Sequence, residues 1–258
     1  MSGHVRAVQR ALAILKAFSL ENPQLSCSEL SRKLKIHPST IHRLLLTMEK
    51  EKIIDRLENG KYALGLKVFE LGCIAAAQRE LVKVARPYLE ELHRISGETV
   101  NLVIMDGTEA IYLDKCENPM SMVQYARIGK RIPLYCSAVG KALLTGFHQE
   151  DLQRALNSIK IIPHTPNTII DVGKLMEAVQ MAKINGYAID NEEVELGIKC
   201  IGAPVKRESG HVIAAISICG PVSRLSGGRF FELVHQVKTT AEKVSNRMGY
   251  CSLNALSL

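Results

Sequence analysis

The chain has 258 residues, of which 47% are hydrophobic and 23% are charged, a composition that excludes disordered and collagen-like proteins. No apolar run reaches the length of a transmembrane helix and no signal peptide opens the chain, so we expect a cytoplasmic globular protein without a membrane partner. The seven cysteines are scattered without a Cys-x-x-Cys pair, which predicts reduced thiols, no metal site and no cofactor.

The excess positive charge is concentrated at the start of the chain. Residues 1–75 hold 12 Lys and Arg against 7 Asp and Glu, whereas the other residues hold 21 against 19. A basic segment of this kind favours contact with the phosphates of nucleic acid. A merely solvated surface explains the charge alone equally well, so the motifs have to decide between the two.

Residues 1–66 predict a winged helix-turn-helix domain. Apolar residues recur at helical spacing from Val5 to Ser19. Ser26 followed three residues later by Glu29 is a capping-box sequence, and it opens a short helix that ends near Leu34. Proline suits the first turn of a helix, so a third helix is expected over residues 38–51.

The third helix has the features of a DNA recognition helix. Hydroxyl groups near its start and an arginine on its outer face suit phosphates and guanine edges in the major groove. Asn59-Gly60 follows between two apolar-rich segments and indicates a type I′ hairpin, the wing. A packing module with a solvated polar face is the alternative. The residues expected to contact DNA are Ser28, Pro38, Ser39, Thr40, His42, Arg43, Thr47, Arg56 and Lys61.

Residues 67–96 are expected to form linker helices, because apolar residues recur at helical spacing over 66–72 and again over 74–95. Pro87 predicts a kink or a break near Arg86. A helix that joins a DNA-binding module to a larger domain often carries a dimer contact, since paired half-sites need paired readers. A helix that only covers the second domain is the alternative.

Residues 97–258 predict an α+β domain in which helices flank an antiparallel sheet. Tight turns and apolar alternation separate the expected strands, and longer amphipathic segments mark the helices. Strands are expected at 99–105, 110–113, 121–126, 187–190, 198–205 and 211–219, and helices at 137–144, 149–157, 172–185 and 229–247.

Three segments of this domain carry chemistry. Ser137 is a good N-cap, and the small residues after it let a carboxylate reach backbone N–H groups at a helix N-terminus. The next lysine, Lys141, lacks the spacing of a phosphate-binding loop. The carboxylates of residues 190–193 can hold a metal, act as acid and base, accept hydrogen bonds from a hydroxylated ligand or be solvated. Ser217 and Cys219 alternate with apolar residues and therefore face one side of a strand.

Together these residues resemble the IclR family of bacterial transcription regulators. The resemblance rests on the winged helix and on residues 129–142, 186–205 and 217–224, and it covers the chain from about Val5 to Gly249. It implies a GAF-like second domain that binds a small organic acid, and a homodimer, often a dimer of dimers, on a palindromic double-stranded operator. The expected effector site consists of Ser137, Ala138, Val139, Gly140, Asp190, Glu193, Cys200, Ser217 and Cys219.

The fold class expected is therefore an all-α-dominated winged helix-turn-helix domain followed by an α+β GAF-like domain. One departure from the family pattern is Ile201-Gly202-Ala203 before Pro204, where Gly202 is expected to widen the local packing. The run from Leu134 to Ala138 looks most like members that serve sugar-acid catabolism, so a sugar acid or its keto-deoxy product is the expected effector.

We therefore predict a ligand-responsive repressor of a catabolic operon and not an enzyme. One alternative is an enzyme acting on a small carboxylic acid with an appended helical module. Another is a structural zinc protein that uses the scattered cysteines and histidines.

Overall fold

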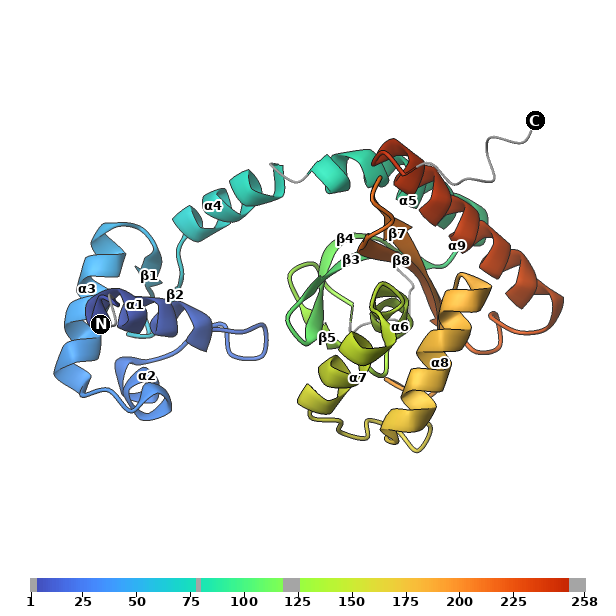
Figure 1. Cartoon of the computed structure of the whole chain (residues 1–258). Coiled ribbons are helices and arrows are strands. Elements are labelled where there is room, and N and C mark those ends of the chain that lie inside the picture. Colours follow the sequence, from blue (N-terminus) through green and yellow to red (C-terminus); the bar gives the residue numbers. More distant parts are fainter. Residues whose placement is uncertain (1–3, 78–79, 118–125, 251–258) are drawn as a thin grey trace. The chain divides into compact units, whose positions relative to one another are not determined.

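The computed structural model describes residues 4–77, 80–117 and 126–250 (Figure 1). The chain divides into two compact units, Met1–Gln78 and Arg79–Leu258, and the division falls inside the predicted linker. Among the helices of the described residues, none is long and apolar enough to cross a membrane.

The first unit is a three-helix domain with a small hairpin. Ser26 Oγ accepts a hydrogen bond from Glu29 N at 3.2 Å, and Ser26 N donates to the Glu29 carboxylate at 2.7 Å, so the predicted capping box is confirmed. Ile14, Leu30 and Ile41 are fully buried in the core between the helices. The elements are α1 (Arg6–Ala17), α2 (Cys27–Leu34), α3 (Pro38–Lys50), β1 (Ile54–Arg56) and β2 (Tyr62–Leu64).

The hairpin forms, but the predicted type I′ turn is wrong. Leu57 N donates to Lys61 O at 2.8 Å and Gly60 N donates to Leu57 O at 3.0 Å, which makes a three-residue loop. Gly60 has a φ of +74°, whereas Asn59 is not among the described residues with positive φ. A type I′ turn needs positive φ at both central residues. Asn59 contributes instead through its side chain, which accepts a hydrogen bond from Lys61 N at 3.0 Å.

Two helices follow, α4 (Leu66–Ala77) and α5 (Glu80–Ser96). Pro87 lies inside α5, so of the kink or break predicted near Arg86, the break does not occur. A proline in a helix interior removes one backbone hydrogen bond. Here α5 remains a helix because Ala85, Leu89 and Leu92 pack in the core between the sheet and α9. In α4, by contrast, large apolar side chains are exposed: Leu66 at 67%, Phe69 at 69% and Ile74 at 55%.

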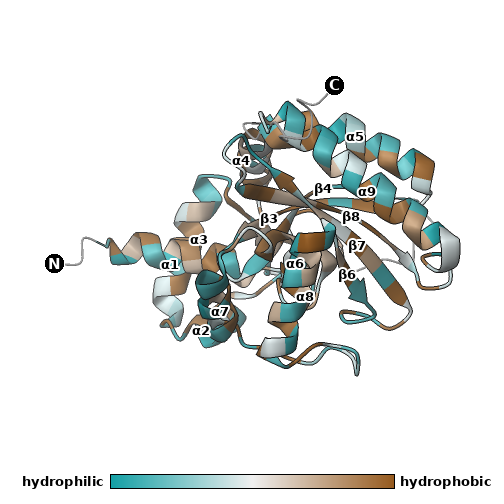
Figure 2. Cartoon of the chain, turned by 45° about the vertical axis from the view of Figure 1, so that its right-hand side comes forward, coloured by the Kyte–Doolittle hydropathy of each residue, from teal (hydrophilic) through white to brown (hydrophobic). Residues whose placement is uncertain are grey.

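The second unit is built on a six-stranded antiparallel sheet with the order β5-β4-β3-β8-β7-β6. Helices α5 and α9 pack on one face, and α6, α7 and α8 gather on the other (Figures 1 and 2). The strands are β3 (Thr99–Asp106), β4 (Glu109–Cys116), β5 (Arg131–Pro133), β6 (Ala188–Asn191), β7 (Ile198–Lys206) and β8 (Val212–Pro221). The helices are α6 (Ala138–Leu144), α7 (Gln149–Ser158), α8 (Val172–Asn185) and α9 (Gly227–Arg247).

Alternation along the strands explains the two cores. In β3, Val100 and Leu102 join the core beneath α5 and α9, whereas Val103 joins the core beneath α6. Asn101 is paired in register with Ser217 of β8, so their side chains share one face. The strand predicted at 121–126 lies outside the described residues except for Ala126. The short strand β5 was not predicted.

Candidate effector cavity and nucleic-acid surface

A small closed cavity lies where the first turn of α6 meets β4, β5, β6, β7 and β8. Its volume is about 10 Å³, which is about the space that one water molecule needs. The cavity must therefore widen before an organic acid can enter. Seven of the nine residues predicted for the effector site line it. The lining consists of Tyr112, Ile132, Ser137, Ala138, Val139, Asp190, Cys200, Ser217 and Cys219.

Larger grooves exist but do not collect these residues. One groove of about 600 Å³ lies between α7 and α8. Another of about 460 Å³ lies along α8 and β6 and is lined partly by Lys141 and Glu193. We base the site on the small cavity, because it brings together seven of the predicted residues from four elements, namely α6 with its N-cap, β6, β7 and β8.

Two predicted residues, Gly140 and Glu193, lie outside the cavity wall. Gly140 N donates to Ser137 Oγ at 3.1 Å, so this amide caps the helix and does not face a ligand. A Cβ at Gly140 would lie 2.3 Å from the carbonyl oxygen of Leu134. The small residue is therefore required for close packing. The interpretation that it opens a path to the backbone N–H is wrong.

Gly202 has a similar packing role. A Cβ there would lie 2.8 Å from the carbonyl carbon and oxygen of Ala138. The expectation that Gly202 widens the local packing is therefore wrong. The glycine allows the backbone of β7 to lie close to the first turn of α6.

Asp190 is the buried carboxyl group of the cavity wall, with only 1% of its surface exposed. One of its oxygens accepts a hydrogen bond from Glu193 N at 2.7 Å. Burial, reinforced by the nearby Glu193 carboxylate, raises the pKa of Asp190 to about 7, while Lys141 opposes the shift. Near neutral pH this group can therefore either donate or accept a hydrogen bond.

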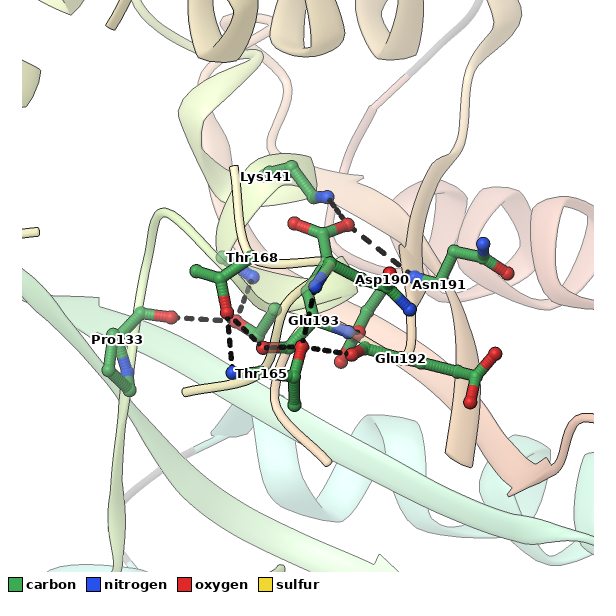
Figure 3. A network of polar contacts seen from close by, with 11 residues as sticks. Pro133, Lys141, Thr165, Thr168, Asp190, Asn191, Glu192 and Glu193 are labelled. Carbon is green, nitrogen blue, oxygen red and sulfur yellow. Dashed lines mark hydrogen bonds and ion pairs between the residues drawn. The ribbon is translucent and has the colours of Figure 1, made fainter. Parts of the chain in front are cut away.

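The carboxylate cluster behind Asp190 is structural (Figure 3). Lys141 Nζ lies 2.5 Å from Glu193 Oε1, and both side chains are buried, at 3% and 5% exposure. Thr168 Oγ1 donates to the Glu193 carbonyl at 2.7 Å, and Thr165 Oγ1 donates to the Glu192 carbonyl at 2.6 Å. No group of three potential metal ligands gathers within the described ranges. The ion pair fixes α6 to the segment after β6.

Asp190 predicts a pH dependence of stability. Its pKa is about 7 in the folded protein against an ordinary value of 3.8, so between these values the folded state holds a proton that the unfolded state has released. This contribution to stability therefore decreases as pH rises through that window. We expect Asp190→Asn to be more stable than the wild type at pH 8, with the difference vanishing near pH 4. Urea unfolding at both pH values measures it, and parallel pH profiles would contradict it.

Tyr112 and Ile132 are wall residues that the sequence did not predict. Both are buried, and burial raises the pKa of the Tyr112 phenol. In the sequence Tyr112 looks like an ordinary member of an apolar strand, and Ile132 lies in β5, which was not predicted. Only the pairing of β4 with β3 and β5 shows which side of the sheet they face.

In the first unit, α3 presents a polar surface. Ser39, His42, Arg43 and Thr47 are exposed, and Thr40 is half-buried. The Ser39 hydroxyl lies 2.8 Å from His37 Nδ1, the N-cap residue of α3. Of the other residues predicted to contact DNA, Ser28, Pro38 and Arg56 are exposed and Lys61 is half-buried.

A groove of about 280 Å³ between α1 and α3 adds two arginines to this surface. Arg6 and Arg10 of α1 line it together with Arg43, Thr40 and Thr47 of α3. None of the three arginines has an ion pair within the described part of the chain. Arg6 and Arg10 were not predicted as contact residues, although their spacing of four places them on one face of a helix.

Comparison with known proteins identifies the class. The model of the IclR helix-turn-helix domain matches residues 7–58. The model of the C-terminal domain of the bacterial transcriptional regulator IclR matches residues 73–246. The chain belongs to the IclR family.

Individual relatives agree with this assignment to the IclR family. The transcriptional regulator KdgR of Escherichia coli (strain K12) is 35% identical over 247 residues, covering 95% of this chain and 94% of that protein. The transcriptional repressor AllR of the same organism is 34% identical over 245 residues, covering 95% and 90%. The crystal structure of Thermotoga maritima IclR matches with a TM-score of 0.78 at 30% identity, covering 96% of this chain and all of that one.

Membership of the IclR family means that this chain is a DNA-binding transcriptional regulator with a C-terminal effector-binding domain. The matched families and relatives are regulators, so the alternative of a small-acid enzyme is set aside. The structural zinc protein is set aside for the same reason.

Proposed function

We propose that this IclR-family regulator represses a catabolic operon in the cytoplasm and leaves its palindromic operator when a small organic acid binds. A sugar acid or a keto-deoxy product is the effector we favour. The observation that carries the proposal is the closed cavity, whose wall joins the α6 N-terminus to Asp190 and to the polar residues of β7 and β8.

In this proposal the carboxylate of the effector accepts hydrogen bonds from the N–H groups of Ala138 and Val139 at the capped end of α6. Asp190 accepts a hydrogen bond from a hydroxyl group of the effector. Cys200, Ser217 and Cys219 form the opposite wall of the cavity. Gly140 and Glu193 support the site without touching the effector. The six-stranded antiparallel sheet, covered by helices on both faces, supports the GAF-like assignment of the domain.

We propose that the protein acts as a homodimer or a dimer of dimers. The exposed apolar residues of α4 support this, because patches of large apolar side chains mark interaction sites. Two copies would present two α3 helices to the half-sites of a palindrome. An effector changes DNA affinity only if it binds one arrangement of the protein better than the other. The effector would bind the arrangement with a widened cavity better than the arrangement with a closed one.

For DNA recognition, we expect Arg43→Ala to lose about 1–3 kcal/mol of specific binding and to relax the preference at one base position. The measurement is a gel-shift series on duplexes that the wild type selects from a random library. Arg10→Ala is the matched variant. It should weaken binding to all duplexes alike, and the dependence of the binding constant on salt concentration should fall by the amount expected for about one phosphate contact. An Arg43→Ala protein with unchanged affinity and preference would exclude Arg43 as a residue that contacts bases.

For effector response, we expect Asp190→Ala to bind the operator as the wild type does but to stay bound when effector is added. Thermal-shift screening of sugar acids and keto acids identifies the acid to use, because a ligand of the native state raises the melting temperature. If the variant releases DNA at the same acid concentration as the wild type, the effector site lies elsewhere.

A further inference from the structure

Asn101 of β3 is a buried polar residue that neither the fold nor the cavity wall explains. Its exposed fraction is 0%. Its Nδ2 donates to Ser217 Oγ at 3.3 Å and lies 3.6 Å from Cys219 Sγ. Its Oδ1 has no hydrogen-bond partner within the described part of the chain. One end of the amide is thus anchored on β8 while the other is unpaired.

An unpaired buried acceptor destabilises the folded protein, because the group has lost its hydrogen bonds to water and gained none in return. Glu193 Oε2 and Gln236 Oε1 share this property among the described side chains. Glu193 is compensated through its other oxygen by Lys141, and Gln236 lies on α9, on the far face of the sheet. Of the three, only Asn101 has a hydrogen bond, within the described part of the chain, from its own side chain to residues of the cavity wall.

The position of Asn101 associates it with the effector cavity. It is paired in register with Ser217, so the two side chains share the sheet face beneath α6. Ser217 and Cys219, the two groups that hold its Nδ2, both line the cavity. Asn101 therefore lies directly beside the β8 part of the wall.

We propose that Asn101 is a specificity-determining residue of the effector site, where Oδ1 accepts a hydrogen bond from a hydroxyl group of the effector. The inference rests on the proposed effector function and narrows it: the ligand is a hydroxylated carboxylic acid and not a plain one. A site with a buried acceptor discriminates strongly against analogues that lack the matching donor, because the acceptor is then left unpaired.

The test uses two matched pairs of acids, gluconate with hexanoate and glycolate with acetate, on the full-length wild type and Asn101→Leu. In the wild type, the hydroxylated member of at least one pair should raise the melting temperature more than its partner. In Asn101→Leu this difference should shrink, because one hydroxyl group of the effector has lost its acceptor while Asp190 still accepts a hydrogen bond from another. The unliganded variant should also melt at a higher temperature than the wild type, because its unpaired acceptor is gone.

Asn101→Ala repeats the measurement with a smaller side chain in case leucine disturbs folding, and it is judged by the discrimination between acids alone. Val103→Ala is the matched control, since Val103 is fully buried on the same strand and the same face. It should lower the melting temperature but retain the discrimination.

The inference is overturned if Asn101→Leu and Asn101→Ala distinguish the acids as strongly as the wild type does. A wild type that responds to none of the acids counts against the proposed effector class. The melting temperature of unliganded Asn101→Leu, compared with that of the wild type, shows separately whether the Asn101 amide destabilises the folded protein.

Discussion

Replacing Lys141 by methionine is expected to cost about 3–5 kcal/mol of unfolding free energy, the usual effect of removing one partner from a buried ion pair. The pair lies in the second unit, where Lys141 and Glu193 are 3% and 5% exposed. Without Lys141, the Glu193 carboxylate would be buried with its Oε2 atom already unpaired. Urea unfolding followed by circular dichroism measures the loss, with the second unit analysed as its own transition.

Two further variants complete this test. Glu193→Leu added to Lys141→Met removes the stranded charge and should recover most of the lost stability. Arg154→Met removes an exposed ion pair with Asp151, in which the two side chains are 76% and 49% exposed, and it should change stability little. A Lys141→Met protein as stable as Arg154→Met would show that the buried pair is not isolated from water.

Gly140→Ala is expected to destabilise the second unit by the upper part of the ~1–3 kcal/mol range that overpacking costs. The added methyl group would lie 2.3 Å from a backbone oxygen of Leu134, and backbone cannot rotate away as a side chain can. The first turn of α6 must then shift from the strand end, and the shift should also weaken any response to effector. Melting temperature and effector-induced shift are the two measurements.

Gly228→Ala is the control for Gly140→Ala. This glycine lies in α9, and a Cβ there would meet nothing within 4 Å. Alanine favours a helix over glycine by ~0.5–1 kcal/mol, so the control should be neutral or slightly stabilised. Equal losses of stability in the two variants would mean that the close approach of Gly140 to Leu134 does not determine the effect of the substitution.

Local sequence signals predicted most of the helices and strands. Capping residues such as Ser26 and Ser137 and the proline at Pro38 act within one turn of the chain, so the sequence contains the full cause of each helix start. The type I′ turn and the break at Pro87 were predicted wrongly because both depend on contacts beyond one turn of the chain. The φ of Asn59 depends on which loop the hairpin closes, and Pro87 is accommodated because α5 packs on the sheet.

The candidate site was predicted only where a short motif carried it. Seven cavity residues were predicted from motifs, and Ile132 lies in one of these motifs but was not singled out. Tyr112 and Asn101 became visible only through strand register, which links residues far apart in the chain. The role of Lys141 was hidden for the same reason. Its partner Glu193 is 52 residues away, and nothing in the sequence near Lys141 reports that the pair is buried.

The closed cavity also bears on how much effector the regulator needs. If only a fraction of molecules is open at any moment, the apparent dissociation constant is the intrinsic one divided by that fraction. The concentration at which the operon responds is then set by packing as well as by contacts. Substitutions at Tyr112 or Ile132, which line the cavity with large side chains, can move that threshold without altering which acid is recognised.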